Sequence, residues 1–378
     1  MLIGVVAEVD SSETRVAATA ETVKKFVGLG ADVVVERGAG LKAGVTDADY
    51  QSAGARLAEA GQVLGEADVL LKVRRPSEAE LGRIKHDALV VATMDPYGHG
   101  EAIEAMAKAG IAAFAMELLP RITRAQVMDV LSSQANLAGY RAVVDAAAEY
   151  GRALPMMMTP AGTVPAAKAF IMGVGVAGLQ AIATARRLGA IVTATDVRPA
   201  TKEQVESLGA KFIAVEDDEF KQAETAGGYA KEMSAAYRAK QAELVASHIA
   251  KQDMVITTAL IPGRPAPRLI DAAMVASMRP GSVIVDLAVE RGGNCELAKA
   301  GELVTTDGGV KIIGYSNVTR LAATASSLYA RNLYAFVETL IDKATKSLAV
   351  KWDDELVKAT LLTRDGAIVN PNFQPKTA

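Results

Sequence analysis

The chain has 378 residues, half of them apolar and only 4% aromatic, and its formal net charge is −3. This length predicts about two domains, because one domain usually takes roughly 100 to 200 residues. The charge balance provides no basic surface for nucleic acid, and the single Cys295 excludes an intrachain disulfide.

The sequence also bears on compartment and metals. No cluster of Cys and His has metal-ligand spacing, so we expect no metal site and a reducing compartment. The N-terminus lacks the pattern of a secretory signal, which predicts a cytoplasmic protein. Residues 169–185 are uncharged over nearly the length of a membrane span, but three glycines, a Gln and a Thr favour a buried strand-turn-helix. We therefore expect no membrane insertion.

Five short apolar runs in the first third of the chain alternate with helix-like stretches. The runs comprise residues 2–9, 31–36, 67–73, 88–93 and 110–116. Between the first two runs, Val23, Phe26 and Val27 share one face of a predicted helix. Short apolar strands separated by helices predict a parallel sheet covered on both faces, with right-handed crossovers.

A long helical pattern over residues 132–152 follows, and the strand-helix rhythm then restarts and continues to about residue 316. Another helical stripe covers about 319–340. The remaining tail is too short to fold alone, so we expect it to return to the first domain.

These patterns predict an α/β fold with two Rossmann-like, doubly wound parallel-sheet domains joined by long helices. The first domain is predicted to be discontinuous, with residues 1–131 and about 341–378. The second takes residues 132–340 and includes the bridging helices. The two similar halves suggest an old duplication.

The second half opens with a dinucleotide-binding pattern. A strand over 169–172 is followed by Gly173, Gly175 and Gly178 and then by a helix. The first glycine permits a tight turn, the second lets the backbone approach a pyrophosphate, and the third lets the helix pack on the strand. The phosphates would meet the positive end of that helix. The alternative is a glycine-rich turn that merely packs a helix on a strand.

Asp196 follows the next strand, 18 residues after Gly178. A carboxylate at this position accepts hydrogen bonds from the adenosine ribose and repels a 2′-phosphate, which favours NAD over NADP. The nearby Arg198 weakens that preference slightly. The predicted cofactor is therefore NAD(H).

Long stretches of the chain resemble the NAD(H)-binding component, domain I, of proton-translocating nicotinamide nucleotide transhydrogenase. The resemblance runs almost from end to end. Its most specific stretches are residues 116–143, 173–190, 194–212, 223–233 and 257–270. The same two-domain fold is shared with alanine dehydrogenase, to which the resemblance is weaker.

The resemblance implies an activity and partners. In that family, this component passes a hydride from NADH directly to NADP+ carried by a separate nucleotide-binding domain, and a membrane domain couples the transfer to proton translocation. It implies a homodimer, located at the inner face of the cytoplasmic membrane as a peripheral subunit. Hydride transfer between two nicotinamide rings needs no general acid or base, so the task of the protein is positioning.

The resemblance also implies functional residues. Arg121, Gln126 and Asp129 match the family segment that holds the nicotinamide and faces the NADP-bearing partner, and Ser132 matches a carboxamide contact. The alternative for this segment is a solvated polar turn with a helix cap at Asp129 or Ser132.

Further cofactor contacts are implied on the nucleotide-binding half. They are Val176, Val197, Arg198, Ala259 and Leu260, beside the glycines and Asp196. Tyr229, next to two glycines in a polar stretch, resembles the tyrosine of a family loop that closes over bound nucleotide. The alternative is a surface loop with an incidental tyrosine.

Two other functions compete with the transhydrogenase hypothesis. Alanine dehydrogenases use an Arg, a Lys and a His on their keto acid; Arg15 and Lys72 match the first two. The His has no match, because residues 94–96 read Met-Asp-Pro and His99 lies further along. This favours an interpretation of Arg15 and Lys72 as salt-bridge partners. The other competing function is a non-catalytic NAD-binding module.

Overall fold

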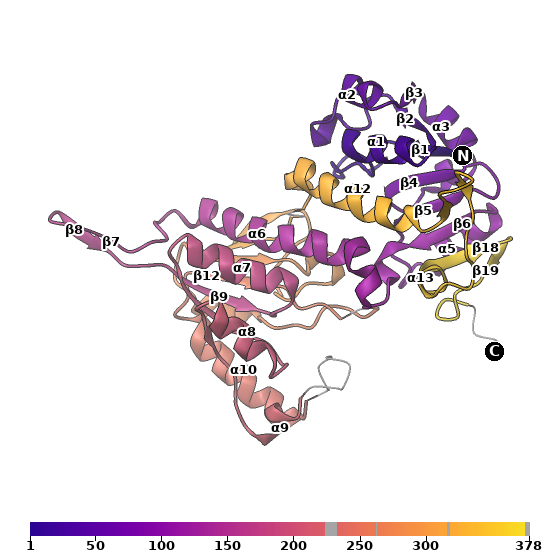
Figure 1. Cartoon of the computed structure of the whole chain (residues 1–378). Coiled ribbons are helices and arrows are strands. Elements are labelled where there is room, and N and C mark those ends of the chain that lie inside the picture. The colour runs from indigo at the N-terminus through magenta and orange to yellow at the C-terminus, as the bar shows by residue number, and fades with distance from the viewer. Residues whose placement is uncertain (224–232, 262, 316–317, 375–378) are drawn as a thin grey trace. The chain divides into compact units, whose positions relative to one another are not determined.

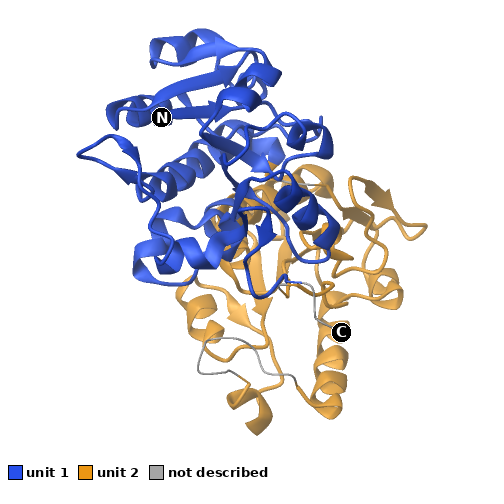
Figure 2. Ribbon diagram, turned by 90° about the vertical axis from the view of Figure 1, so that its right-hand side faces the viewer, with its two compact units in different colours: residues 1–134, 319–378 blue, residues 135–318 orange. Residues whose placement is uncertain are grey.

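The computed structural model describes residues 1–223, 233–261, 263–315 and 318–374. It divides into two compact units, coloured separately in Figure 2: unit 1 holds residues 1–134 and 319–378, and unit 2 holds residues 135–318. Within the described residues, no helix combines the length and the apolar character that crossing a membrane requires.

Unit 1 is built on an eight-stranded sheet with the order β19-β18-β6-β5-β4-β1-β2-β3. Its strands are β1 (Leu2–Val5), β2 (Asp32–Glu36), β3 (Arg56–Ala58), β4 (Val69–Arg74), β5 (Leu89–Thr93), β6 (Ala112–Ala115), β18 (Leu361–Arg364) and β19 (Ala367–Ile368). The pairings among β1 to β6 are parallel, whereas β18 pairs antiparallel with β6. The C-terminal tail thus extends the sheet that the N-terminus begins.

The helices of unit 1 cover both faces of this sheet. They are α1 (Ala20–Gly28), α2 (Asp47–Ser52), α3 (Ala60–Glu66), α4 (Glu78–Leu81), α5 (Gly100–Lys108), α12 (Ala322–Glu338) and α13 (Glu355–Thr360), with the 3₁₀ turns η1 (Leu41–Ala43), η2 (Met116–Leu118), η3 (Thr123–Met128) and η5 (Thr319–Leu321). A short pair, β16 (Ile341–Asp342) and β17 (Ser347–Leu348), follows α12. Because side chains alternate along a strand, Leu71 joins the core cluster under α12, while Leu70 joins the one under α5.

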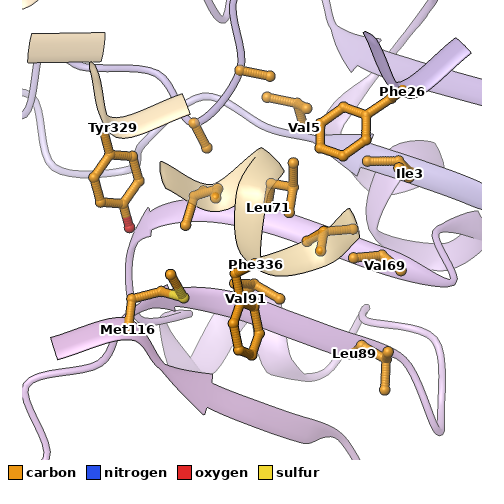
Figure 3. Close-up of a cluster of buried hydrophobic side chains, with 14 of the residues drawn as sticks. Ile3, Val5, Phe26, Val69, Leu71, Leu89, Val91, Met116, Tyr329 and Phe336 are labelled. Carbon is orange, nitrogen blue, oxygen red and sulfur yellow. The ribbon is translucent and has the colours of Figure 1, made fainter. Parts of the chain in front are cut away.

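Helix α12 packs by its apolar stripe into the core of unit 1. Tyr329, Leu333 and Phe336 are buried at helical spacing. Phe336 lies against Val91 of the sheet (Figure 3), and the Tyr329 hydroxyl donates to the carbonyl of Lys72 in β4 at 3.0 Å. The sequence pattern predicted this helix in the second domain. The structure differs, because the stripe fills the core of unit 1 rather than that of unit 2.

Unit 2 contains a seven-stranded sheet with the order β11-β10-β9-β12-β13-β15-β14. Its strands are β9 (Lys168–Met172), β10 (Ile191–Thr195), β11 (Lys211–Phe212), β12 (Met254–Thr257), β13 (Val283–Asp286), β14 (Leu303–Thr305) and β15 (Lys311–Ile313). Among the described strand pairings of this seven-stranded sheet, only the edge pairing of β14 with β15 is antiparallel. The helices are α7 (Val176–Arg187), α8 (Thr201–Ser207), α9 (Asp218–Lys221), α10 (Ala235–Ile249) and α11 (Ala272–Ser277), with the 3₁₀ turn η4 (Val289–Arg291).

Two further elements complete the chain. Helix α6 (Val130–Tyr150) begins in unit 1 and continues into unit 2. The hairpin of β7 (Met157–Thr159) and β8 (Gly162–Val164) reaches away from the remainder of unit 2 (Figure 1). The predicted α/β class with two Rossmann-like, mainly parallel sheets is confirmed, and antiparallel strands are added at the sheet edges.

Candidate dinucleotide site

The glycine-rich turn lies at the topological switch point of the unit 2 sheet. Strand β9 pairs with β10 on one side and with β12 on the other, so the chain leaves β9 in the middle of the sheet. In open α/β sheets, ligands bind outside the carboxyl ends of the strands at this point. The strand ends that converge there are Met172, Thr195 and Thr257.

The three glycines of the turn have different surroundings, and glycine suits each position for a different physical reason. Gly173 adopts φ +99°, and a Cβ there would lie 2.6 Å from Thr258 Oγ1, which itself donates to the Gly173 carbonyl at 3.0 Å. A Cβ on Gly178 would lie 1.9 Å from the same carbonyl oxygen, so only glycine lets α7 pack on β9. Around Gly175 a Cβ would meet nothing within 4 Å. This leaves an open approach to the start of α7.

Helix α7 offers its amino end at that opening. Gly175 precedes its first residue, Val176, and no side-chain hydrogen bond from the described part of the chain caps this end. The first amides of a helix have no partner within it and carry the positive end of its dipole. A pyrophosphate fits this position, as it does at the first turn of other dinucleotide-binding sheets.

Asp196 is held by four hydrogen bonds rather than left open. Its Oδ1 accepts the backbone amide and Nε of Arg198, both at 2.9 Å, and its Oδ2 accepts the Val174 amide at 2.8 Å and Arg198 Nη2 at 2.9 Å. A carboxylate has about four acceptor sites, and all are used. A ribose hydroxyl would therefore replace one of the Arg198 bonds. The sequence does not predict how closely these two residues pair. Arg198 lies two residues after Asp196, and this spacing does not show which way the Arg198 side chain points.

The segment after β12 is fixed by a residue that sequence reasoning missed. Asn294 is fully buried; its Oδ1 accepts the Ala259 amide at 3.0 Å, and its Nδ2 donates to the carbonyls of Ala259 at 2.9 Å and Pro267 at 2.8 Å. One side chain thus clamps both ends of the segment that exposes Leu260. Its only signal in the sequence was an asparagine after two glycines.

The segment predicted to face a partner lies in unit 1, around η3. Gln126 is exposed there, and the segment is anchored on the neighbouring helix α13 by Arg124, whose guanidinium contacts Asp354 at 2.7 and 2.9 Å. The buried Ala125 and Met128 hold it from beneath. This arrangement presents the Gln126 side chain on a fixed backbone.

Asp129 and Ser132 form the cap of α6. Asp129 Oδ1 accepts the Ser132 amide at 2.9 Å, and Oδ2 accepts the Ser132 hydroxyl at 2.5 Å. Asn332 of α12 also donates to the carbonyl of Val127 at 2.9 Å. The helix-cap interpretation therefore describes these two residues in the structure, while Arg121 is an exposed residue of the preceding turn. Tyr229 lies outside the described residues.

Arg15 and Lys72 are both engaged by carboxylates of unit 1. Lys72 is 1% exposed, and its Nζ lies 2.7 Å from Glu80 and 3.4 Å from Glu8. Burial raises the pKa of Glu8 against the opposing charge of Lys72. Arg15 contacts Glu13 at 2.7 Å and donates to Gln134 at 2.9 Å. These pairs satisfy both cations without a bound keto acid.

Comparison with known proteins identifies the family. Residues 4–138 match the family described as "Alanine dehydrogenase/PNT, N-terminal domain", and residues 142–371 match "Alanine dehydrogenase/PNT, C-terminal domain". The chain belongs to the alanine dehydrogenase/PNT family. Membership in this family and the Rossmann-like fold imply NAD(H) binding.

Individual relatives place the chain on the transhydrogenase side of that family. It is 57% identical over 378 residues to the first portion of the NAD(P) transhydrogenase alpha subunit of Rhodospirillum rubrum, covering 98% of each chain. A solved transhydrogenase from Sinorhizobium meliloti matches with a TM-score of 0.89 and 62% identity, over 98% of this chain and 100% of that one. Alanine dehydrogenase of Mycobacterium tuberculosis is 31% identical over 299 residues, covering 78% of this chain and 74% of the relative.

Proposed function

We propose that this chain is the NAD(H)-binding component of a proton-translocating NAD(P) transhydrogenase and passes a hydride from NADH directly to NADP+ on a partner domain. The observation that carries the proposal is the glycine-rich turn at the β9/β12 switch point, with the uncapped start of α7 above it. The similarity to transhydrogenase alpha subunits supports the same assignment.

The protein contributes position rather than proton transfer. The turn from Gly173 to Gly178 binds the pyrophosphate, and the clamped segment at Ala259 and Leu260 contacts the adenosine half. Val197 flanks Asp196 at the adenosine ribose. Arg121, Gln126, Asp129 and Ser132 orient the nicotinamide end. Hydride transfer then depends on how accurately these residues align two nicotinamide rings.

An apolar surface beside Gln126 suits a partner domain. Val127 is 65% exposed and Leu131 is 56% exposed, although both belong to a segment that is otherwise well packed. Exposed apolar side chains next to a functional polar group are typical of protein interaction sites. We assign this surface to the NADP-binding domain, and place the assembly at the inner face of the cytoplasmic membrane, where a membrane domain couples transfer to proton movement.

An alanine dehydrogenase activity is the competing function, and the unit 1 contacts weigh against it. Binding a keto acid at Arg15 and Lys72 would require breaking the pairs with Glu13, Glu80 and Glu8. Leaving a buried carboxylate without its cation costs several kcal/mol, roughly 3 to 5 by analogy with broken buried ion pairs. We therefore favour the transhydrogenase reaction.

Replacing Asp196 with alanine is expected to weaken NADH binding by about 1–3 kcal/mol, because ribose hydroxyls lose their acceptor. The same change releases Arg198, whose guanidinium then attracts a 2′-phosphate, so the preference for NADH over NADPH should fall as well. Equilibrium dialysis of both nucleotides measures the two effects. Unchanged affinity for both nucleotides in Asp196→Ala would contradict the assignment of this residue.

The β7–β8 hairpin supports a proposed homodimer. Met156, Met157 and Met158 are 63%, 45% and 72% exposed, and both strands are exposed along their full length. A two-stranded hairpin is marginally stable alone, so packing against a second copy would stabilise it.

Replacing all three methionines with serine should shift the chain to monomer in sedimentation at micromolar concentration. Leu41→Ser, 60% exposed in unit 1, is the control and should leave the dimer intact. A monomeric wild type, or a dimer unaffected by the triple change, refutes the proposal.

A further inference from the structure

Unit 1 repeats, around its own switch point, the hydrogen bond that fixes the nucleotide-binding turn of unit 2. In unit 2, β9 and β10 align Met172 with Thr195, and Asp196 accepts the amide of Val174 at 2.8 Å. In unit 1, β1 and β2 align Val5 with Val35, and Glu36 accepts the amide of Ala7 at 2.8 Å. Asp196 and Glu36 each come one position after the aligned residue of their own strand, Thr195 or Val35. The amides of Val174 and Ala7 each come two positions after the aligned residue of theirs, Met172 or Val5. The two turns therefore share this hydrogen bond and its register.

A cavity lies beside this repeated feature. It has a volume of about 280 Å³ and opens next to Glu36, with Ala7 and Glu8 after β1 and Ser77 and Glu80 after β4 in its wall. The segment after β4 corresponds to the segment after β12 in unit 2, where Ala259 and Leu260 lie. Apolar side chains of Val6, Ala60 and Leu64 line it as well, and the wall is completed by Val9, Ala79 and the cationic Arg83. The three places that surround an adenosine in a dinucleotide-binding sheet thus surround this cavity.

The carboxylate of Glu36 has unused hydrogen-bond acceptor sites, whereas those of Asp196 are all occupied. Within the described part of the chain, the Ala7 amide is its one hydrogen-bond donor, whereas Asp196 accepts four. Glu36 is half-buried, and a carboxylate in such a place accepts hydroxyl donors readily. A pair of ribose hydroxyls matches this capacity.

The surroundings disfavour a phosphate. Residues 6–19 separate β1 from the start of α1, so no helix begins at the turn, whereas only residues 173–175 separate β9 from α7. The wall carries three carboxyl groups, those of Glu8, Glu36 and Glu80, against one cation, Arg83, and the buried Lys72 already pairs with Glu8 and Glu80. An anionic ligand would meet net negative charge. The volume also falls just below the range of about 300–1,000 Å³ usual for ligand pockets, which suits a nucleoside and not a dinucleotide.

We propose that this cavity is a second ligand site, which binds an unphosphorylated nucleoside through its ribose hydroxyls on Glu36 and its base against Val6, Ala60 and Leu64. The inference depends on the proposed function only through the comparison of the two turns. It adds a binding site to unit 1 that hydride transfer does not use.

The test is binding of adenosine to the full chain saturated with NADH, measured by equilibrium dialysis with labelled adenosine. Saturation with NADH occupies the site of unit 2, so the expected result is one further saturable adenosine site per chain. AMP should bind at least about tenfold more weakly, because its phosphate meets the carboxylates. Adenosine that NADH displaces fully, or that binds no better than AMP, overturns the proposal.

Variants separate this site from that of unit 2. Glu36→Gln should weaken adenosine about tenfold or more, and Ala60→Phe should abolish binding by filling the cavity. Glu59→Gln, a neighbouring carboxylate whose side chain is 83% exposed, is the matched control and should bind adenosine as the wild type does. If neither cavity variant alters adenosine binding, the site lies elsewhere and the proposal fails. Loss of NADH binding with adenosine binding intact would instead count against the proposed function alone.

Discussion

Replacing Gln126 with alanine is expected to slow hydride transfer to a partner-bound NADP+ about a hundredfold, because a displacement of about 1 Å costs that much in rate. NADH affinity should change much less, since the proposed role of Gln126 is to orient the nicotinamide rather than to hold the whole dinucleotide. Stopped-flow transfer and NADH fluorescence titration measure the two quantities separately.

The control for Gln126 is its exposed neighbour Thr123, which begins the same 3₁₀ turn. Thr123→Ala should transfer hydride at the wild-type rate, because the anchors at Arg124, Ala125 and Met128 remain. A Gln126 variant that transfers normally contradicts the assignment. So does one whose rate and NADH affinity fall together, since that result describes a binding residue.

Gly178→Ala is expected to abolish NADH binding and to lower stability by roughly 1–3 kcal/mol or more, the usual cost of overpacking. The added methyl group would lie 1.9 Å from the Gly173 carbonyl oxygen and 2.9 Å from its carbon, which are backbone atoms and not the movable end of a side chain. Helix α7 would have to move away from β9, and the turn would move with it. Denaturant unfolding and NADH titration measure the two losses.

Gly175→Ala provides the matched comparison within the same turn. Since a Cβ there meets nothing within 4 Å, stability should stay near that of the wild type. NADH binding should still weaken, because the methyl group would occupy the approach of the pyrophosphate. If Gly175→Ala lowered stability as much as Gly178→Ala, the open space around Gly175 would be contradicted.

Local sequence patterns predicted several strands and helices of the fold. Apolar runs separated by helical spacings predicted the strands β1, β4 and β5, although β1 ends at Val5, earlier than the predicted strand over 2–9. Beyond it, the Ala7 amide donates to the side-chain carboxylate of Glu36 instead of continuing the backbone pairing of β1 with β2. The glycine-rich turn was also recognisable, since its three glycines depend on contacts within one strand-turn-helix.

Long-range partners could not be read from the sequence. The stripe of α12 is equally compatible with either core, and only packing of Tyr329 and Phe336 against the first sheet assigns it to unit 1. Asn294 acts on Ala259, 35 residues earlier. The antiparallel pairing of β18 with β6 joins Thr363 to Ala113, 250 residues earlier. Such contacts depend on tertiary geometry that periodicity does not encode.

Direct donation of hydride from this chain to NADP+ held by another domain can be followed with isotope-labelled NADH. The chain is mixed with the NADP-binding domain of a transhydrogenase, NADP+, and NADH that carries deuterium in both C4 positions of its nicotinamide. We predict NADPH that carries the deuterium, no exchange of the label with water, and no product when either protein is omitted. Absence of transfer while both nucleotides are bound, or NADPH that has lost the label to solvent, would contradict direct transfer.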